Sequence, residues 1–242
     1  MTNTLILAGF VLISAVEAIE GFISTSKHDK NNVSQAQRIK LYKSNIIWGW
    51  MRTALCIFAL IIFNIPFRKI GIKFPIVNNL DGGLIFSIVT YIVSGGLFII
   101  LLYQIMMYIF SAKYRSEVSK VMQNKKSIEG ADIMLPRSVK EKRWFVVCAI
   151  TAGIGEEVAY RGFLMYLIDS VFLDLNTYIV LAAASIIFGL MHVYQGVSGI
   201  IRTGLTGLLI GALYVSSGSL WLPIALHFTI DFAAAFIYDT VE

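Results

Sequence analysis

Long apolar segments recur along the whole chain, and they leave few folds open to it. Each is about 20 residues long, which is enough for a helix to cross the hydrocarbon core of a bilayer. The runs are continuously apolar rather than alternating and their number is odd, so helices are expected and a membrane β-barrel is not. The seven windows are Thr4–Ile23, Asn45–Phe67, Leu84–Phe110, Trp144–Ile168, Thr177–Tyr194, Gly199–Val215 and Leu220–Tyr238. The sequence therefore predicts an all-α, polytopic membrane protein with about seven transmembrane helices.

Composition agrees with this class. Of the 242 residues, 57% are apolar and 14% are charged, whereas soluble domains have about 45–50% and about 25%. The net charge of +5 does not indicate a nucleic-acid partner, because the basic residues lie between the apolar runs. Cys56 and Cys148 lie inside those runs, so neither a disulfide scaffold nor a cysteine-based metal cluster is expected.

The basic residues predict how the helices are oriented in the cell membrane. Loop 24–44 holds five Lys and Arg residues and loop 111–143 holds nine, whereas loop 68–83 holds three and loop 169–176 holds none. Cytoplasmic loops are enriched in Lys and Arg. The two most basic loops are therefore expected in the cytoplasm, with the N-terminus outside and the C-terminus inside.

The long loop that ends at residue 143 is also the expected boundary between two regions, 1–143 with three spans and 144–242 with four. Ionisable residues at membrane depth lie almost entirely in the second region. They are Glu156, Glu157 and Arg161 in the fourth window, His192 in the fifth, and His227 and Asp231 in the seventh. A charge near the bilayer centre costs roughly 2.5–3.5 kcal/mol, so such residues are taken as functional by default. We therefore expect a four-helix catalytic core in 144–242.

The spacing of these residues indicates how they pair. Glu157 and Arg161 are four residues apart, so they share a helix face and can form an ion pair. Glu156 points about 100° away from Glu157, which leaves it without a cation on its own helix. His227 and Asp231 are also four residues apart, and the carboxylate could fix the orientation of the ring.

One carboxylate and two histidines from three helices form a candidate site for activating water. Glu156 would take a proton from a water molecule that attacks a carbonyl group. His192 and His227 would either donate hydrogen bonds to the developing oxyanion or hold a metal that polarises the carbonyl. No cofactor is certain, but a divalent metal such as zinc would have candidate ligands in Glu156, His192, His227 and Asp231. The residues alone do not choose between these alternatives.

Three motifs, in this order and each inside an apolar segment, resemble those of a known family. The motifs are Glu156-Glu157-x-x-x-Arg161, Phe188-x-x-x-His192 and His227-x-x-x-Asp231. They are similar to the motifs of the CAAX protease and bacteriocin-processing (CPBP, or Abi) family, which includes the type II CAAX prenyl endopeptidases. The resemblance covers about 144–238. It implies an intramembrane endopeptidase, a hydrolase of glutamyl or metallo type, which cleaves leader, bacteriocin or pheromone peptides or prenylated CAAX-like C-termini.

The resemblance also implies roles for the matched residues. Glu156 matches the glutamate that activates water, and His192 matches the histidine that assists it. Glu157 and Arg161 match a supporting pair that keeps the site assembled. Phe188 is expected to be a packing residue.

The last motif departs from the commoner family pattern. His227 and Asp231 match a pair proposed as an oxyanion hole, but the second residue of that pair is often Asn. An ionised Asp accepts hydrogen bonds and cannot donate them. Asp231 is therefore expected to orient His227 or to bind a metal, and not to stabilise an oxyanion directly.

Other functions remain open from the sequence. A family member without catalysis would act as a membrane scaffold or a bacteriocin self-immunity protein, and a polar network can also simply join helices. Buried acids and histidines serve in proton relays of transporters, although no inverted repeat is visible. The expected partners are a peptide or membrane-protein substrate and the lipid bilayer, without nucleic acid, and the oligomeric state is not predicted.

Acidic residues in the first window are expected to have a structural role. Glu17 and Glu20 lie near its inner end, so they either reach the membrane interface or pair with Arg52 of the second window.

Glycines near the motifs predict close packing. Gly153 and Gly155 allow a close approach of helices or leave room for a substrate, and Gly204, Gly207 and Gly211 form an expected helix-packing face.

Overall fold

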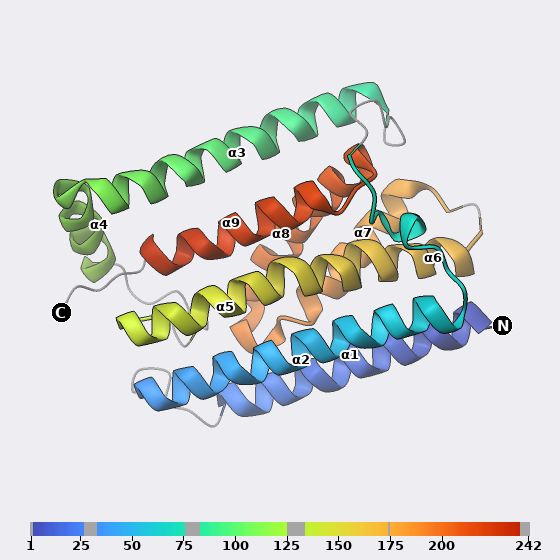
Figure 1. Cartoon of the computed structure of the whole chain (residues 1–242), viewed down its shortest axis with the longest axis horizontal. Coiled ribbons are helices and arrows are strands. Elements are labelled where there is room, and N and C mark those ends of the chain that lie inside the picture. The colour runs from blue at the N-terminus through green and yellow to red at the C-terminus, as the bar shows by residue number, and fades with distance from the viewer. Residues whose placement is uncertain (1, 27–32, 76–82, 125–133, 174, 238–242) are drawn as a thin grey trace.

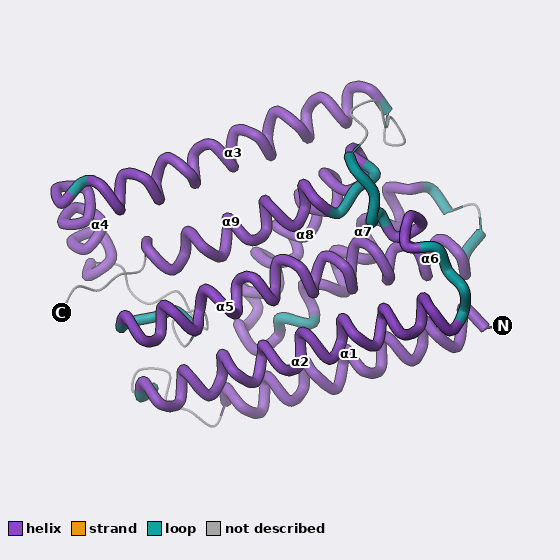
Figure 2. The backbone as a smooth tube through the Cα atoms, viewed as in Figure 1, coloured by secondary structure: helices purple, strands orange, loops and turns teal. Residues whose placement is uncertain are grey.

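The structure, a computed structural model, describes residues 2–26, 33–75, 83–124, 134–173 and 175–237. Within these ranges the fold is all-helical and contains no strand, as expected (Figure 2). The α-helices are α1 (Thr2–Ser26), α2 (Gln35–Ile62), α3 (Leu84–Phe110), α4 (Ala112–Asn124), α5 (Val139–Glu156), α6 (Met165–Val171), α7 (Thr177–Leu190), α8 (Gly196–Ser217) and α9 (Trp221–Ile237). A π-helix covers Glu157–Leu164, and short 3-10 turns cover Phe67–Ile70 and Val193–Gln195.

The long helices lie roughly parallel or antiparallel to one another in a bundle (Figure 1). α5 packs between α2 and α9, and α9 packs in turn against α3, while α7 and α8 pack together behind them. The start of α1 and the end of α9 lie at opposite ends of the bundle (Figure 1). Thus α5, which begins the motif-bearing half of the chain, lies at the centre and contacts helices from both halves.

The number of membrane spans is only partly confirmed. Helices long and apolar enough to cross a membrane are α1, α2, α3 and the stretch Val193–Ser217. α7 and α9 are apolar but shorter, and α7, with 14 residues, extends only about 21 Å at 1.5 Å per residue. That length is less than the hydrocarbon thickness of about 30 Å. The described residues therefore form a multi-pass membrane protein with four candidate spans, and the count of seven stays a prediction.

Helix boundaries agree best where the sequence changes sharply. The window Leu84–Phe110 coincides with α3, whose surface exposes large apolar side chains such as Ile85 (79%) and Ile92 (69%). α2 begins ten residues before the window that starts at Asn45. Its first turns are helical but polar, so a search for apolar runs does not include them. α4 was not expected as a helix, since it is too short and too polar to be an apolar window.

Two capping boxes start α2 and α5 side by side. Ser34 accepts a hydrogen bond from the Gln37 backbone, and Ser138 accepts one from the Glu141 backbone. In return, the Gln37 and Glu141 side chains accept hydrogen bonds from the backbone N–H groups of the two serines. Such reciprocal caps satisfy backbone N–H groups that a helix start leaves free. Glu141 also accepts a hydrogen bond from Arg38 Nε at 3.1 Å, and this pair is buried. The starts of the two helices are therefore tied together at one end of the bundle.

The fourth window is one helical rod with a change of winding in its middle. α5 runs into the π-helix and then into α6, and the residues at the junctions all have right-handed helical angles. All eight residues of Glu157–Leu164 are buried. π-helical turns are rare and occur frequently at functional sites. Here the change of winding falls between the two adjacent glutamates of the first motif.

Some sequence predictions lie outside the described residues. They concern Lys27, Lys30, Lys125 and Lys126 of the basic loops, Asp174 of loop 169–176, and Tyr238 at the end of the seventh window.

Candidate active site

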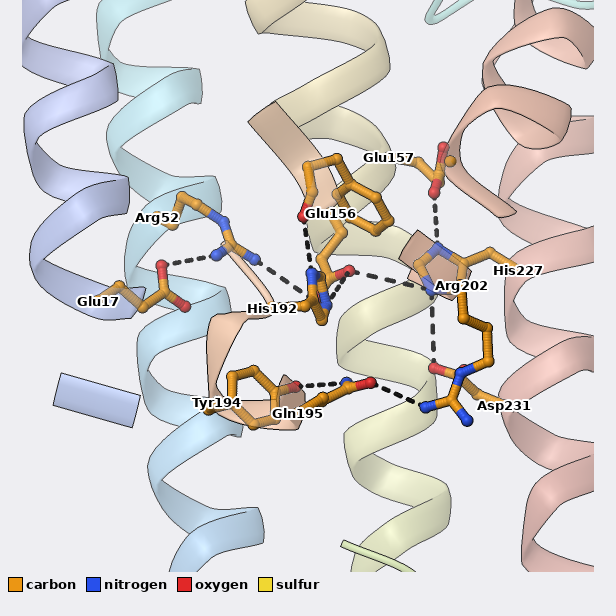
Figure 3. Close-up of polar contacts among 12 residues, drawn as sticks. Glu17, Arg52, Glu156, Glu157, His192, Tyr194, Gln195, Arg202, His227 and Asp231 are labelled. Carbon is orange, nitrogen blue, oxygen red and sulfur yellow. Dashed lines mark hydrogen bonds and ion pairs between the residues drawn. The ribbon is translucent and has the colours of Figure 1, made fainter. Parts of the chain in front are cut away.

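The three motifs meet at one place inside the bundle, as predicted (Figure 3). The first motif lies at the junction of α5 and the π-helix, His192 follows α7, and the third motif lies on α9. The rod, α7 and α9 are therefore the elements that carry the six predicted residues. The contacts among these residues divide into a buried support and a carboxylate that faces a pocket.

Glu157 is the centre of the buried support. Its Oε1 accepts hydrogen bonds from Arg161 at 2.8 Å and from His227 Nδ1 at 2.6 Å. The Glu157 side chain is fully buried, and that of Arg161 is 3% exposed. The predicted ion pair between these two residues is confirmed, and it also reaches α9 through the histidine. A buried carboxylate needs such partners, because an uncompensated charge would cost several kcal/mol.

Arg161 joins this support to two further helices. Its second terminal nitrogen donates to the carbonyl oxygen of Gly207 at 3.1 Å on α8, and its guanidinium lies 4.2 Å from the ring centroid of Phe188 on α7. The sequence predicted a packing role for Phe188. The structure adds a cation–π contact, which strengthens as a site becomes desolvated.

Glu156 faces the other way and holds the centre of the candidate site. Its Oε2 lies 3.9 Å from Nε2 of His192 and 3.9 Å from Nε2 of His227 (Figure 3). These separations are too long for direct hydrogen bonds. They are short enough for one water molecule to bridge the carboxylate and a ring nitrogen.

The hydrogen bonds of the two rings decide which nitrogen carries a proton. His192 Nδ1 lies 2.8 Å from the carbonyl oxygen of Phe188, and His227 Nδ1 lies 2.6 Å from the Glu157 carboxylate. Carbonyl and carboxylate oxygens accept, so both Nδ1 atoms donate. In both rings the other nitrogen, Nε2, faces Glu156.

Asp231 lies within ion-pair distance of His227, but it makes no direct hydrogen bond to the ring, so its expected role in orienting His227 stays a prediction. Its Oδ2 lies 3.7 Å from His227 Nε2, which is beyond hydrogen-bonding distance. The ring is held from its other side by Glu157. Asp231 lies on the Nε2 side of the ring, with 33% of its side chain exposed.

Sequence reasoning missed one cation at the site. Glu156 has no cation on its own helix, but Arg52 of α2 places one terminal nitrogen 3.9 Å from Glu156 Oε1. The other terminal nitrogen donates to Glu17 of α1 at 2.6 Å (Figure 3). The predicted alternative that Glu17 pairs with Arg52 is thus confirmed. An arginine at the middle of an apolar window was the available signal for the missed contact.

The predicted glycines bring the helices together. A Cβ atom at Gly155 would lie 2.6 Å from Thr53 Oγ1 on α2, and one at Gly153 would lie 3.1 Å from Phe228 Cβ on α9. Both positions therefore serve helix packing and do not leave room for a substrate.

The predicted packing face of α8 is also present. A Cβ atom at Gly207 would lie 2.9 Å from a Phe188 ring carbon, and one at Gly211 would lie 2.5 Å from a Leu181 methyl carbon. A Cβ atom at Gly204 would lie 3.6 Å from the Ser185 carbonyl oxygen. The face of α8 that carries these glycines therefore packs against α7.

A pocket of about 410 Å³ lies in front of Glu156. Its lining includes Glu17, Ser44, Trp48, Arg52, Met134, Cys148, Glu156, His192, Tyr194, Gln195, Arg202, Thr206, His227 and Asp231. The lining extends to Met134, whose carbonyl accepts a hydrogen bond from Tyr42 near the start of α2. The pocket therefore runs from the motif residues toward the end of the bundle where α2 and α5 begin, and α1 and α2 contribute to its wall.

A polar chain crosses this pocket wall. Arg202 donates to Gln195 at 3.0 Å, and Gln195 donates to the Tyr194 hydroxyl at 3.1 Å (Figure 3). These residues lie in and after the turn that carries His192. Arg202 and Gln195 were not predicted, because neither belongs to a recognisable motif.

The candidate metal ligands lie close to one another at the site. Glu156, His192, His227 and Asp231 have donor atoms that zinc accepts. In the described part of the chain, however, no group of three or more His, Cys, Asp or Glu side chains is arranged to hold a metal ion. A divalent metal at this site stays a prediction.

Comparison with known proteins finds one family match, and it falls on the motif-bearing region. Residues 139–233 match a family model described as type II CAAX prenyl endopeptidase Rce1-like. No curated protein and no solved structure matches the chain. The matched segment begins with the first residue of α5 and contains all six predicted site residues. The resemblance that the three motifs predicted is thus confirmed: residues 139–233 match the model of the Rce1-like type II CAAX prenyl endopeptidases, and this match is consistent with the CPBP family.

Proposed function

We propose that this protein is an intramembrane endopeptidase that hydrolyses a peptide bond with a water molecule activated by Glu156. The observation that carries the proposal is that Glu156 Oε2 lies 3.9 Å from Nε2 of both His192 and His227. A carboxylate and two ring nitrogens can position one water at that distance inside the pocket. The Rce1-like match supports the same class of reaction.

The proposed step needs only water as co-reactant. The water oxygen bonds to the carbonyl carbon of the scissile peptide while one water proton passes to Glu156, and the carbonyl π electrons move to the carbonyl oxygen. When this tetrahedral oxyanion collapses, the C–N bond breaks and the leaving amine takes the proton from Glu156. One new carboxyl terminus and one new amino terminus result, and the enzyme returns to its starting state.

The two histidines would serve this step differently. His192 donates through Nδ1 to the Phe188 carbonyl, so Nε2 of the neutral ring accepts a hydrogen bond from the attacking water. His227 is held through Nδ1 by Glu157. When protonated, it would donate from Nε2 to the oxyanion, with the carboxylate of Glu157 as its counter-charge.

The family match and the pocket support a proposal for the substrate class. The family match names CAAX prenyl endopeptidases, and the pocket is large enough for a peptide segment. We propose a membrane-associated peptide or protein, either a leader, bacteriocin or pheromone-type peptide or a prenylated CAAX-like C-terminus. The pocket runs toward the end of the bundle at which α4 and the start of α5 lie, so the substrate would enter from the side that positive charge assigns to the cytoplasm.

The test uses purified protein in liposomes with small membrane peptides. Wild type is compared with Glu156→Gln, which keeps the shape of the side chain and removes its ability to take a proton. The matched control is Glu117→Gln, which changes an exposed glutamate paired with Lys120 far from the motifs. We expect new peptide termini, detected by mass spectrometry, with wild type and with the control but not with Glu156→Gln.

Three outcomes would contradict the proposal. Equal cleavage by wild type and Glu156→Gln would exclude Glu156 as the base. No cleavage by folded wild type would favour a scaffold or self-immunity protein, and solute or proton flux without peptide products would favour a transporter. Activity lost on chelation and restored by one divalent ion would favour a metallo-endopeptidase.

A further inference from the structure

Two charged residues outside the family-matched segment border the candidate site. Arg52 lies on α2 and Glu17 lies on α1, and both line the pocket in front of Glu156. The matched segment begins only at residue 139, so neither residue belongs to a motif of the family region. Arg52 is nevertheless the nearest cation to one oxygen of the proposed base.

The surroundings of Arg52 leave it little freedom. The residue is 6% exposed, and its guanidinium carbon lies 5.3 Å from the ring centroid of Tyr160. One terminal nitrogen donates to Glu17 Oε2 at 2.6 Å and the other lies 3.9 Å from Glu156 Oε1. The buried Nε atom has no hydrogen-bond partner in the structure. A buried arginine with a carboxylate on each side is thus fixed by one of them and points toward the other.

The two oxygens of Glu156 therefore have different neighbours. Oε1 faces Arg52, whereas Oε2 faces the ring nitrogens of His192 and His227. This asymmetry matters for catalysis, because a general base must present a defined lone pair to the attacking water. A carboxylate whose first oxygen is drawn toward a fixed cation presents its second oxygen to the water.

We propose that Arg52, held in place by Glu17, is a positioning residue for the Glu156 carboxylate. This inference rests on the proposed function and adds to it a contribution from α1 and α2. Glu17 has a specific part in it. Without Glu17, the planar guanidinium would be free to bind Glu156 through both oxygens, and Oε2 would no longer be available to water.

A role in substrate binding is the competing interpretation. An arginine with a free Nε could instead hold a carbonyl or carboxylate of the peptide. That role would change KM, whereas positioning of the base changes kcat, since the interaction gains its effect in the transition state. The two roles therefore separate in steady-state kinetics.

The chain offers a matched control for the loss of a buried arginine. Arg38 lies on the same helix, is also buried (5% exposed), and also pairs with a glutamate of another helix, Glu141, at 3.1 Å. One of its nitrogens likewise has no partner. It lies 14 residues before Arg52, which is about 21 Å along the helix. Arg38→Gln thus carries the structural cost of a broken buried pair without touching Glu156.

The experiment measures kcat, KM and thermal unfolding for full-length protein in liposomes. The variants are Arg52→Gln, Arg52→Lys, Glu17→Gln, the double variant Glu17→Gln/Arg52→Gln, and the control Arg38→Gln. We expect Arg52→Gln to lower kcat by about 10²-fold, the loss that a misplacement of about 1 Å can cause, with little change in KM. Arg38→Gln should lower the unfolding temperature but leave kcat of the folded protein unchanged.

The remaining variants test how the two residues act together. Arg52→Lys should recover part of kcat, because an ammonium group supplies the charge without the fork that reaches both carboxylates. Glu17→Gln should lower kcat as well, and the double variant should be no slower than Arg52→Gln, because residues that act as a unit are not additive.

Each contrary result has a distinct meaning. If Arg52→Gln and Arg52→Lys are folded and have wild-type kcat, or if they lose no more activity than Arg38→Gln, the positioning role is wrong. A rise in KM with unchanged kcat would overturn it in favour of substrate binding. If wild type itself produces no cleavage beyond that of Glu156→Gln, the proposed function fails first, and the positioning role fails with it.

Discussion

The two adjacent glutamates show how neighbouring residues of one type acquire different tasks. Glu157 is fully buried and accepts hydrogen bonds from Arg161 and His227, whereas Glu156 keeps 18% of its side chain exposed and faces the pocket. A carboxylate that already accepts two short hydrogen bonds, as Glu157 does, supports the arrangement of its neighbours. One whose Oε2 has its nearest nitrogens at 3.9 Å is available to water. The environment, and not the residue type, therefore separates the proposed base from its support.

The position of Asp231 leads to a prediction at this scale. It lies 3.7 Å from His227 Nε2 without a direct hydrogen bond to the ring, so Asp231→Asn should fold normally and retain cleavage. The amide of Asn accepts hydrogen bonds and also donates them, so a donor placed beside the oxyanion should keep kcat equal to that of wild type or raise it. Steady-state kinetics and thermal unfolding in liposomes measure both effects.

His227→Ala is the comparison for that experiment, since it removes the ring that Asp231 flanks. Loss of cleavage in Asp231→Asn as complete as that in His227→Ala would contradict the prediction and assign an essential charge to Asp231.

At the scale of elements, the site depends on how closely α5 approaches its neighbours. Gly155 faces Thr53 of α2 and Gly153 faces Phe228 of α9. The two glycines come directly before Glu156 and Glu157, so the same rod packs on two sides and presents Glu156 on a third. The approach to α2 also sets the distance between Arg52 and Glu156.

Gly155→Ala should therefore disturb both stability and activity. The added Cβ would lie 2.6 Å from Thr53 Oγ1, and overpacking of this kind costs typically 1–3 kcal/mol. We expect a lower unfolding temperature, measured by a thermal scan in detergent, together with a lower kcat.

Gly95→Ala on α3 is the matched control. Nothing lies within 4 Å of a Cβ atom at this helical position, and alanine favours a helix over glycine by up to about 1 kcal/mol. This variant should be as stable as wild type or more so. Equal stability of Gly155→Ala and Gly95→Ala would show that α5 and α2 can separate without cost.

Most of the element pattern could be predicted from the sequence, for reasons that the structure makes plain. Apolar runs identify α3 to the residue because polar segments border it on both sides. The motif spacing predicts the Glu157–Arg161 pair because both residues lie on one rod. The π-helix, the ring contact from Glu157 and the approach of Arg52 could not be predicted, since each depends on tertiary packing and none has a periodic signal.

The whole molecule joins a region that matches a family to one that does not. The division into 1–143 and 144–242 stays a prediction, but α1 and α2 supply part of the pocket wall and a cation near Glu156. The pair Arg38–Glu141 and the capping boxes fasten the same two helical regions together at one end of the bundle. The first region is thus structurally part of the site.

The orientation in the membrane is a prediction for the whole chain. Two variants, Lys69→Cys and Lys113→Cys, each carry one cysteine, and these two cysteines lie near opposite ends of the bundle. In both variants Cys56 and Cys148 are replaced by serine. Because loop 111–143 is the most basic, a membrane-impermeant thiol reagent should label Lys69→Cys in intact cells and Lys113→Cys only after the membrane is opened. The reverse pattern would place the C-terminus outside.

The π-helical turn has a consequence for how related sequences should be compared. Winding determines rotational phase, and in an α-helix each residue advances the chain by about 100°. The π-helical turn at Glu157–Leu164 is wider than an α-helical turn. The direction in which each later side chain points therefore depends on how many residues this segment contains. A relative with one residue more or fewer there would keep every letter of the motifs and still turn its arginine, or all that follows it, away from the partners. Gaps in this segment should therefore be read as changes of geometry, even where the motif letters are retained.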